Sequence, residues 1–215
     1  MNIMNKIEYI FFDFNGTIID DMDLCLGLLN ELLKTQNKGP VSMDEYTHIF
    51  TFPIKEYYRK AGLDFNIESY ESMANRFIDK YKKGFLSCSL YPDTIETLEY
   101  LKNKGIKLIC LSATEINMLK MQLNFFEIAD YFDYILGIGD IYAKSKEDVA
   151  INFMNSHNID KSKAILIGDT LHDYECASKM GIEAILTYSG HQAVDVLEKS
   201  GSTIIKNISV LKELL

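Results

Sequence analysis

The chain has 215 residues, of which 47% are hydrophobic and 25% are charged. This composition is typical of a folded globular enzyme and excludes a disordered, collagen-like or membrane-embedded chain. The formal net charge of −9 disfavours a nucleic-acid polymer as a partner, because an acidic protein repels the phosphate backbone.

Short apolar runs recur along the chain and predict the strands of a sheet. The first run spans residues 7–12 and stops at Asp13, as a buried parallel strand would. Five further runs are each bounded by glycine, aspartate or serine, namely 106–111, 134–136, 164–167, 184–186 and 203–205.

Helical patterns separate these apolar runs. They follow Asp93, Glu115, Lys146, Asp173 and Gln192. In the first of them, Ile95, Leu98 and Leu101 share a face. Strands that alternate with helices predict an α/β fold, in which helices cover both faces of a doubly wound parallel sheet and make three layers. Ligands of such sheets bind beyond the carboxyl ends of the strands.

Residues 21–86 interrupt this alternation with helical periodicity and no convincing strand. One apolar stripe consists of Cys25, Leu28, Leu29, Leu32 and Leu33, and another of Tyr70, Met73, Ala74, Phe77 and Tyr81. An all-helical insertion after the first strand would lie as a lid over the end of that strand. We therefore expect a core domain of residues 1–20 and 87–215, a helical cap domain of residues 21–86, and hinges at 19–21 and 86–90.

Two polar side chains follow the first two predicted core strands. Asp13 begins the sequence Asp-Phe-Asn-Gly-Thr, in which Gly16 helps to form a turn, and its carboxylate can attack phosphorus as a nucleophile. Ser112 directly follows the strand 106–111, and its hydroxyl can donate to a phosphoryl oxygen. Taken singly, Asp13 is better explained as a turn cap and Ser112 as a helix cap.

A lysine and two carboxylates complete the set of candidates. Lys144 or Lys146, just before a helix, can neutralise both the nucleophile and the phosphoryl group, although a lysine in such a run is ordinarily solvated. Asp169 and Asp173 follow the strand 164–167, and two neighbouring carboxylates usually bind a hard cation such as Mg²⁺. A helix-capping cluster would explain only one of the two aspartates.

These four elements, in this order at the ends of separate strands, resemble the haloacid dehalogenase superfamily, most of all its phosphoglycolate-phosphatase-like branch with a helical cap. The resemblance covers nearly the whole chain. It implies a Mg²⁺-dependent phosphatase that hydrolyses a small phosphorylated metabolite, such as phosphoglycolate, a sugar phosphate or a nucleotide, through an aspartyl-phosphate on Asp13.

The resemblance also implies a role for each candidate. The metal ligands would be Asp13, the backbone carbonyl of Asn15 and Asp169, with Asp173 orienting metal-bound water. The phosphate-binding residues would be Asn15, Gly16, Ser112, Ala113 and Lys146. The Ser145-Lys146 pair favours Lys146 as the active-site lysine, whereas alignment on Asp148 favours Lys144.

Asn15 departs from the pattern of these phosphatases, which usually have aspartate at this position. That aspartate protonates the leaving alkoxide and then activates water, so an amide should slow turnover by ~10²–10⁴-fold. Either His172 takes over proton transfer, or it is a partly exposed loop histidine. The alternative function is a protein that binds a phosphorylated ligand with little catalysis. Mutase and dehalogenase chemistry fit the pattern less well.

The remaining polar candidates receive no chemical role. The scattered cysteines are expected to be reduced. No signal peptide or membrane-spanning run is found, which makes the cytoplasm the expected compartment. A monomer is the default state, and a dimer is possible. Three histidines lack ligand spacing, namely His48, His157 and His191. A solvated face is expected for Tyr57, Tyr58, Arg59 and Lys60, although an inward Arg59 could clamp a substrate carboxylate.

Overall fold

The computed structural model describes residues 7–139 and 145–215. Within these residues, six strands form one parallel sheet in the order β5-β4-β1-β6-β7-β8. The strands are β1 (Tyr9–Phe12), β4 (Lys107–Glu115), β5 (Tyr134–Ile138), β6 (Ala164–Gly168), β7 (Glu183–Thr187) and β8 (Thr203–Ile205). The six predicted strands are all present. β1 lies inside the sheet between β4 and β6, which explains its continuous apolar sequence.

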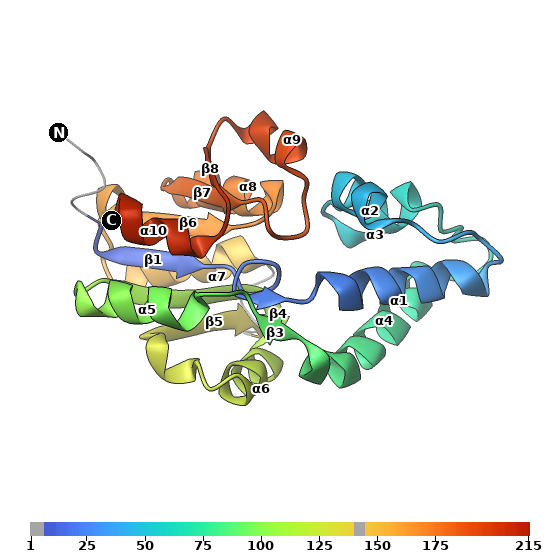
Figure 1. Cartoon of the computed structure of the whole chain (residues 1–215), viewed down its shortest axis with the longest axis horizontal. Coiled ribbons are helices and arrows are strands. Elements are labelled where there is room, and N and C mark those ends of the chain that lie inside the picture. Colours follow the sequence, from blue (N-terminus) through green and yellow to red (C-terminus); the bar gives the residue numbers. More distant parts are fainter. Residues whose placement is uncertain (1–6, 140–144) are drawn as a thin grey trace.

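Helices cover both faces of the sheet, as predicted for a doubly wound fold (Figure 1). Ile10 and Phe12 pack toward α5 (Thr94–Asn103), α6 (Ile116–Phe125) and α10 (Leu211–Leu214). Phe11 points the other way, toward α7 (Lys146–Ser156) and α8 (Leu171–Met180). This alternation along β1 gives the core two separate apolar layers. The short α9 (Val194–Leu197) lies at the end of the sheet that faces the cap helices.

Two details of the core differ from the prediction. Ile95 is 43% exposed, because the buried arc of α5 is centred on Thr94, Thr97, Leu98 and Leu101 instead. β4 does not end at Leu111 but continues to Glu115. Its pairing with β5 jumps from Leu111↔Leu136 to Glu115↔Ile138, so the extra residues between them bulge out of the ladder.

A helical unit follows β1 and lies beyond the carboxyl end of the sheet (Figure 1). Its helices are α1 (Met22–Thr35), α2 (Met43–Ile49), α3 (Ile54–Lys60) and α4 (Tyr70–Gly84). They share an apolar core of their own, in which Leu29 and Leu33 of α1 pack with Met73 of α4. We propose this unit as the cap domain, with the bounds expected from the sequence.

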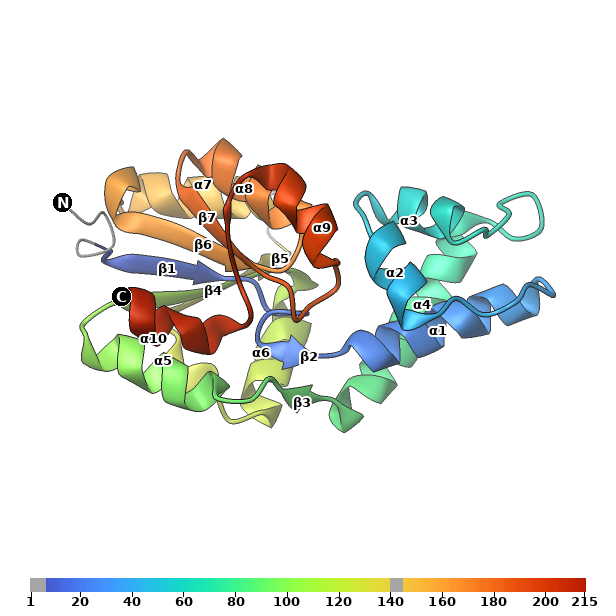
Figure 2. The same cartoon turned by 45° about the horizontal axis from the view of Figure 1, so that its top comes forward.

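The two connections between the core and the helical unit run side by side. β2 (Ile19–Asp20) pairs antiparallel with β3 (Ser89–Leu90), at the expected hinge positions (Figure 2). Short 3₁₀ helices complete the fold at Phe85–Ser87, Ala129–Tyr131, Lys161–Lys163, Glu198–Ser200 and Ile208–Val210. None of the helices within the described ranges is both long and apolar enough to cross a bilayer.

Candidate active site

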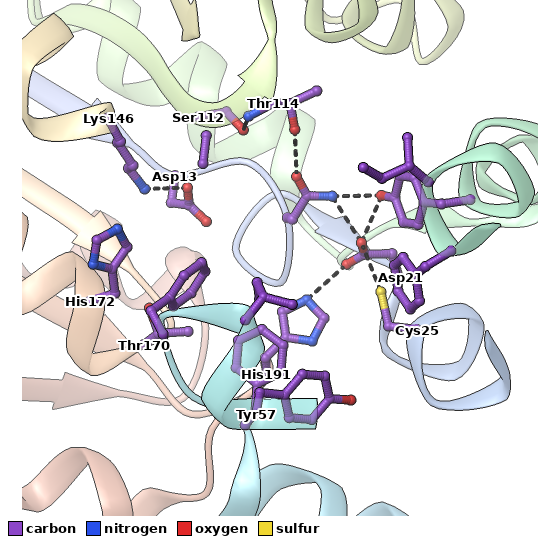
Figure 3. Close-up of a pocket in the computed structure, with 18 of the residues that line it drawn as sticks. Asp13, Asp21, Cys25, Tyr57, Ser112, Thr114, Lys146, Thr170, His172 and His191 are labelled. Atoms are coloured by element: carbon purple, nitrogen blue, oxygen red, sulfur yellow. Dashed lines mark hydrogen bonds and ion pairs between the residues drawn. The ribbon is translucent and has the colours of Figure 1, made fainter. Parts of the chain in front are cut away.

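Asp13 and Lys146 meet at the carboxyl end of the central strand. The backbone N–H of Asp13 still donates to Ile167 O at 2.8 Å, which fixes the residue at the tip of β1. Lys146 begins α7 directly after the cap residue Ser145, and its side chain is only 3% exposed. Its ammonium contacts Asp13 Oδ1 and lies 2.6 Å from Asp173 Oδ1 (Figure 3). The structure thus places Lys146 at this site, whereas Lys144 lies outside the described residues.

Asp169 and Asp173 follow β6, the neighbour of β1. Asp169 Oδ1 accepts from Thr17 Oγ1 at 3.1 Å, and Oδ2 accepts from the backbone N–H of His191 at 2.7 Å. Asp173 Oδ2 accepts from the backbone N–H and the hydroxyl of Thr170, at 3.0 and 2.7 Å. Asp173 therefore stabilises the first turn of α8 with one oxygen and binds Lys146 with the other.

The carboxylates of Asp13, Asp169 and Asp173 are buried and offer oxygen atoms within 4.8 Å of one another. Burial raises the pKa of Asp13 to about 8, although Lys146 opposes the shift. Burial also raises the pKa of Asp169 to about 6 against the effect of His191. Lys146 overcomes burial at Asp173 and holds its pKa below the usual range. The single ammonium of Lys146 cannot balance three buried carboxylates, and carboxylate oxygens are the ligands that hard divalent cations prefer. The arrangement is therefore suited to bind such a cation.

Gly16 allows the loop after Asp13 to lie directly against Asp169. Its φ of +74° is in the left-handed region, and a Cβ atom there would lie 2.3 Å from Asp169 Oδ2 and 2.6 Å from His191 Cδ2. Both the backbone conformation and the space therefore require glycine. This close approach holds the nucleophile loop beside the second carboxylate-bearing loop.

Ser112 and Ala113 lie in the bulged part of β4, at the edge of the pocket. The Ser112 side chain is buried, and its hydroxyl accepts from the backbone N–H of Thr114 at 3.1 Å. Ala113 is exposed and lines the same pocket as Asp13. The three consecutive residues Ser112, Ala113 and Thr114 in the bulge all line this pocket.

The side chain of Asn15 is held by the hinge and the cap. Its amide nitrogen donates to Asp21 Oδ2 at 2.8 Å and to the hydroxyl of Tyr81, on α4, at 2.6 Å. Its carbonyl oxygen accepts from Thr114 Oγ1 at 3.3 Å. Tyr81 donates in turn to Asp21 Oδ2 at 2.7 Å. Asn15 therefore joins the nucleophile loop to the helical unit through a network of polar side chains (Figure 3).

His191, for which no chemical role was predicted, is a buried member of this network. Its Nε2 lies 3.2 Å from Asp21 Oδ1, its Nδ1 lies 2.7 Å from the hydroxyl of Tyr46, and its ring stacks on Phe50 at 4.8 Å. Although burial disfavours the imidazolium, Asp21 raises the pKa of His191 to about 9. The available signal was its position in the loop after β7, where a parallel sheet places ligand-binding residues.

Asp21, Cys25 and His191 also lie close enough together to bind a metal. However, both oxygens of Asp21 are occupied, because they accept from Asn15, Gly16 and Tyr81 in addition to facing His191. Cys25 donates to Asp21 Oδ2 at 3.6 Å, and burial raises the pKa of its thiol. In the described structure, these three side chains therefore form a hydrogen-bonded centre around Asp21.

The structure locates the side chains of three other candidates. His172 lies in the first turn of α8 and not in a loop, and it lines the cavity described below. His172 stacks on Phe52 of the helical unit at 4.4 Å, and its Nδ1 is 3.9 Å from Glu175 Oε2. Tyr57 and Tyr58 are buried in the cap core, so the expected solvated face was wrong for them. Arg59 is exposed and paired with Glu56, and so does not point inward.

A cavity of about 640 Å³ joins these groups between the core and the helical unit. Asp13, Ser112, Lys146, Asp169 and Asp173 line it from the core. Aromatic side chains of α2, α3 and α4 and of the segment between α2 and α3 line it from the other side. The reactive carboxylate of Asp13 thus faces a partly open cavity that is large enough for a small organic molecule.

A doubly wound core with an inserted helical unit, and a carboxylate at the end of its central strand, defines a class of capped α/β hydrolases. The sequence model described as haloacid dehalogenase-like hydrolase matches residues 10–187, and the chain therefore belongs to this family. The resemblance found in the sequence is confirmed.

Individual relatives agree with this assignment. The chain is 26% identical to a phosphoglycolate phosphatase of Agrobacterium fabrum over 93% of its own length and 88% of the relative. It is 22% identical to phosphoglycolate phosphatase 1 of Pseudomonas aeruginosa, over 93% and 76% of the two chains. The structure of a haloacid dehalogenase-like family hydrolase from Streptococcus pneumoniae has a similar fold, with a TM-score of 0.82, 22% identity and coverage of 98% and 100%.

Proposed function

We propose that this chain is a Mg²⁺-dependent phosphatase that hydrolyses a small phosphorylated metabolite through an aspartyl-phosphate on Asp13. The observation that carries the proposal is the position of the Asp13 carboxylate, which meets a buried lysine and two further buried carboxylates at the cavity between the core and the helical unit. The names of the relatives in Agrobacterium and Pseudomonas support a phosphomonoester as the substrate class.

In the proposed reaction, an Asp13 oxygen attacks phosphorus and the bond to the leaving alkoxide breaks, which produces an acyl-phosphate. Water then attacks the same phosphorus, phosphate leaves, and the carboxylate is restored. Lys146 offsets the negative charge that Asp13 and the phosphoryl group bring together. Ser112 and the backbone around Gly16 and Ala113 would hold the phosphoryl oxygens.

The carboxylates fit a divalent cation, and members of this family generally use one. Asp13, the backbone carbonyl of Asn15 and Asp169 would hold Mg²⁺, with Asp173 beside them. When bound, the ion would reduce the repulsion between an anionic nucleophile and an anionic substrate. It would also keep Asp13 ionised, because a nearby positive charge opposes the rise in pKa that burial causes.

Turnover of p-nitrophenyl phosphate, with and without Mg²⁺, tests the proposal. Its acidic leaving group needs little proton donation, so the absence of an aspartate at position 15 should not prevent the reaction. We expect Mg²⁺-dependent hydrolysis that EDTA abolishes and that Asp13→Asn removes. Wild-type activity in freshly purified Asp13→Asn would show that another group is the nucleophile.

A second candidate function is binding of a phosphorylated ligand with little catalysis. It is favoured by Asn15, whose amide is committed to Asp21 and Tyr81 and cannot supply a proton. The two functions differ in the same assay, because a binder would show no Mg²⁺-dependent turnover of p-nitrophenyl phosphate or of a panel of phosphorylated metabolites. Phosphate or vanadate would nevertheless bind to it.

We further propose that the protein acts in the cytoplasm. Cys25, Cys88, Cys110 and Cys176 are all free, which fits a reducing compartment. The acidic net charge is in keeping with a small-molecule substrate and not with a nucleic acid.

A further inference from the structure

The part of the cavity away from Asp13 is walled by aromatic and aliphatic side chains. One face of α4 contributes Tyr70, Ala74, Phe77, Ile78 and Tyr81. The opposite wall is formed by Tyr46, Phe50, Phe52, Ile54, Tyr57 and Tyr58. Met118 and Ile138 of the core also line it, next to the polar Thr114 and Glu115. The leaving group of a phosphomonoester bound at Asp13 would lie against these side chains.

The cationic residues among the described lining of this cavity are all engaged or peripheral. Lys146 lies between Asp13 and Asp173, and His191 faces Asp21. Lys82 is exposed to solvent. A substrate carboxylate or second phosphate that entered the aromatic part of the cavity would lose most of its hydration, which is unfavourable. The aromatic part of the described lining therefore favours an uncharged leaving group over a short anionic one, such as that of phosphoglycolate.

The size and shape of the cavity also favour a larger, flat group. A volume of about 640 Å³ far exceeds the space that a two-carbon leaving group fills. The rings of Phe50 and Tyr57 lie 5.0 Å apart, and Phe52 stacks on His172 at 4.4 Å, so flat surfaces already line the cavity. Aromatic side chains bind flat rings through stacked and edge-to-face contacts.

We propose that the leaving group of the substrate carries an aromatic or heteroaromatic ring and that this ring packs between α4 and the Phe50–Tyr58 wall. The inference rests on the proposed phosphatase function and adds the chemical class of its substrate. Ala74 and Ile78 are specificity-determining residues in this arrangement, because they set the width of the cavity on the α4 side.

Three primary alkyl phosphates with leaving groups of similar acidity test the inference: 2-phenylethyl phosphate, n-propyl phosphate and 2-phosphoglycolate. In the presence of Mg²⁺, we expect kcat/KM for 2-phenylethyl phosphate to exceed that for n-propyl phosphate at least about tenfold, with 2-phosphoglycolate the poorest. A preference for 2-phosphoglycolate, or equal values for the three, would overturn the substrate class while leaving the phosphatase function intact. Failure to hydrolyse p-nitrophenyl phosphate as well would overturn both.

Substitutions on α4 locate the ring within the cavity. Ala74→Phe fills the space on the α4 side, and we expect it to lower the ratio of kcat/KM for 2-phenylethyl phosphate over n-propyl phosphate about tenfold. Asn75→Phe is the matched control, because Asn75 is exposed and is not part of the described cavity lining. An unchanged ratio in Ala74→Phe, or an equal fall in Asn75→Phe, would place the ring elsewhere and refute the assignment.

Discussion

Lys146 is the residue whose removal should change both stability and its pH dependence. Its side chain is 3% exposed, and its ammonium binds the carboxylates of Asp13 and Asp173, of which Asp173 is 2% exposed. Lys146→Met keeps the length of the side chain but leaves two buried carboxylates without their partner. Breaking a buried ion pair in this way costs about 3–5 kcal/mol. We expect a loss of this size in the free energy of unfolding of the metal-free protein near neutral pH.

The same contacts fix how this loss varies with pH. Lys146 overcomes burial and lowers the folded-state pKa of Asp173 below its ordinary value of 3.8. The resulting stabilisation is present above that value and is lost as the pH falls through the folded-state pKa. In Lys146→Met the pKa of Asp173 should rise, so that its carboxylate takes up a proton on mild acidification. The difference in stability between the wild type and the variant should therefore shrink from about pH 8 to about pH 4.

Urea unfolding in EDTA, followed by circular dichroism at the two pH values, measures this difference. Lys107→Met is the control, because Lys107 is 55% exposed and lies 2.8 Å from Asp133 in a surface ion pair. Its loss should cost only about 0–1 kcal/mol. A loss of less than about 1 kcal/mol in Lys146→Met, or a loss that does not change with pH, would refute the reasoning.

Three further substitutions test neighbouring parts of the site. Asp13→Asn should abolish turnover and yet raise the stability of the metal-free protein near pH 8. Burial raises the pKa of Asp13 to about 8, so the folded state is destabilised as the pH rises toward that value and the carboxyl group ionises. Thermal unfolding in EDTA measures the difference, and lower stability in Asp13→Asn would contradict the prediction. Gly16→Ala should weaken Mg²⁺ binding, measured by calorimetry, because its Cβ would collide with Asp169, and unchanged affinity would count against the proposed ligands. Asn15→Asp should destabilise the protein near neutral pH, because the new carboxylate would face the carboxylate of Asp21 where Asn15 now donates a 2.8 Å hydrogen bond. In urea unfolding, the double variant Asn15→Asp/Asp21→Asn should recover the lost stability, and additive losses would argue against the contact.

The core of the fold follows from local patterns in the sequence. The apolar run before Asp13 is continuous because β1 is covered on both faces, and the helices between strands show the period of amphipathic helices. Since the strands are parallel, their carboxyl ends meet at one edge of the sheet. Topology alone therefore predicted that Asp13, Ser112 and Asp169 would approach one another.

Contacts between the helical unit and the core could not be predicted in the same way. The pairing of His191 with Asp21 joins residues 170 positions apart and depends on how the unit is placed over the sheet. Tyr57 and Tyr58 resembled a solvated face because charged neighbours follow them, yet the small cap core buries both. The extension of β4 beyond Leu111 is likewise set by its pairing with β5 and not by its own sequence.

Rapid acid quenching during turnover tests the covalent role of Asp13 most directly. With a substrate that carries a radiolabelled phosphoryl group, and with hydrolysis confirmed in the same sample, digestion and peptide mapping should place the label on the peptide that contains Asp13. Hydroxylamine should release it, as expected for an acyl-phosphate. A protein that turns over the substrate and never carries the label on Asp13 would contradict the proposed mechanism.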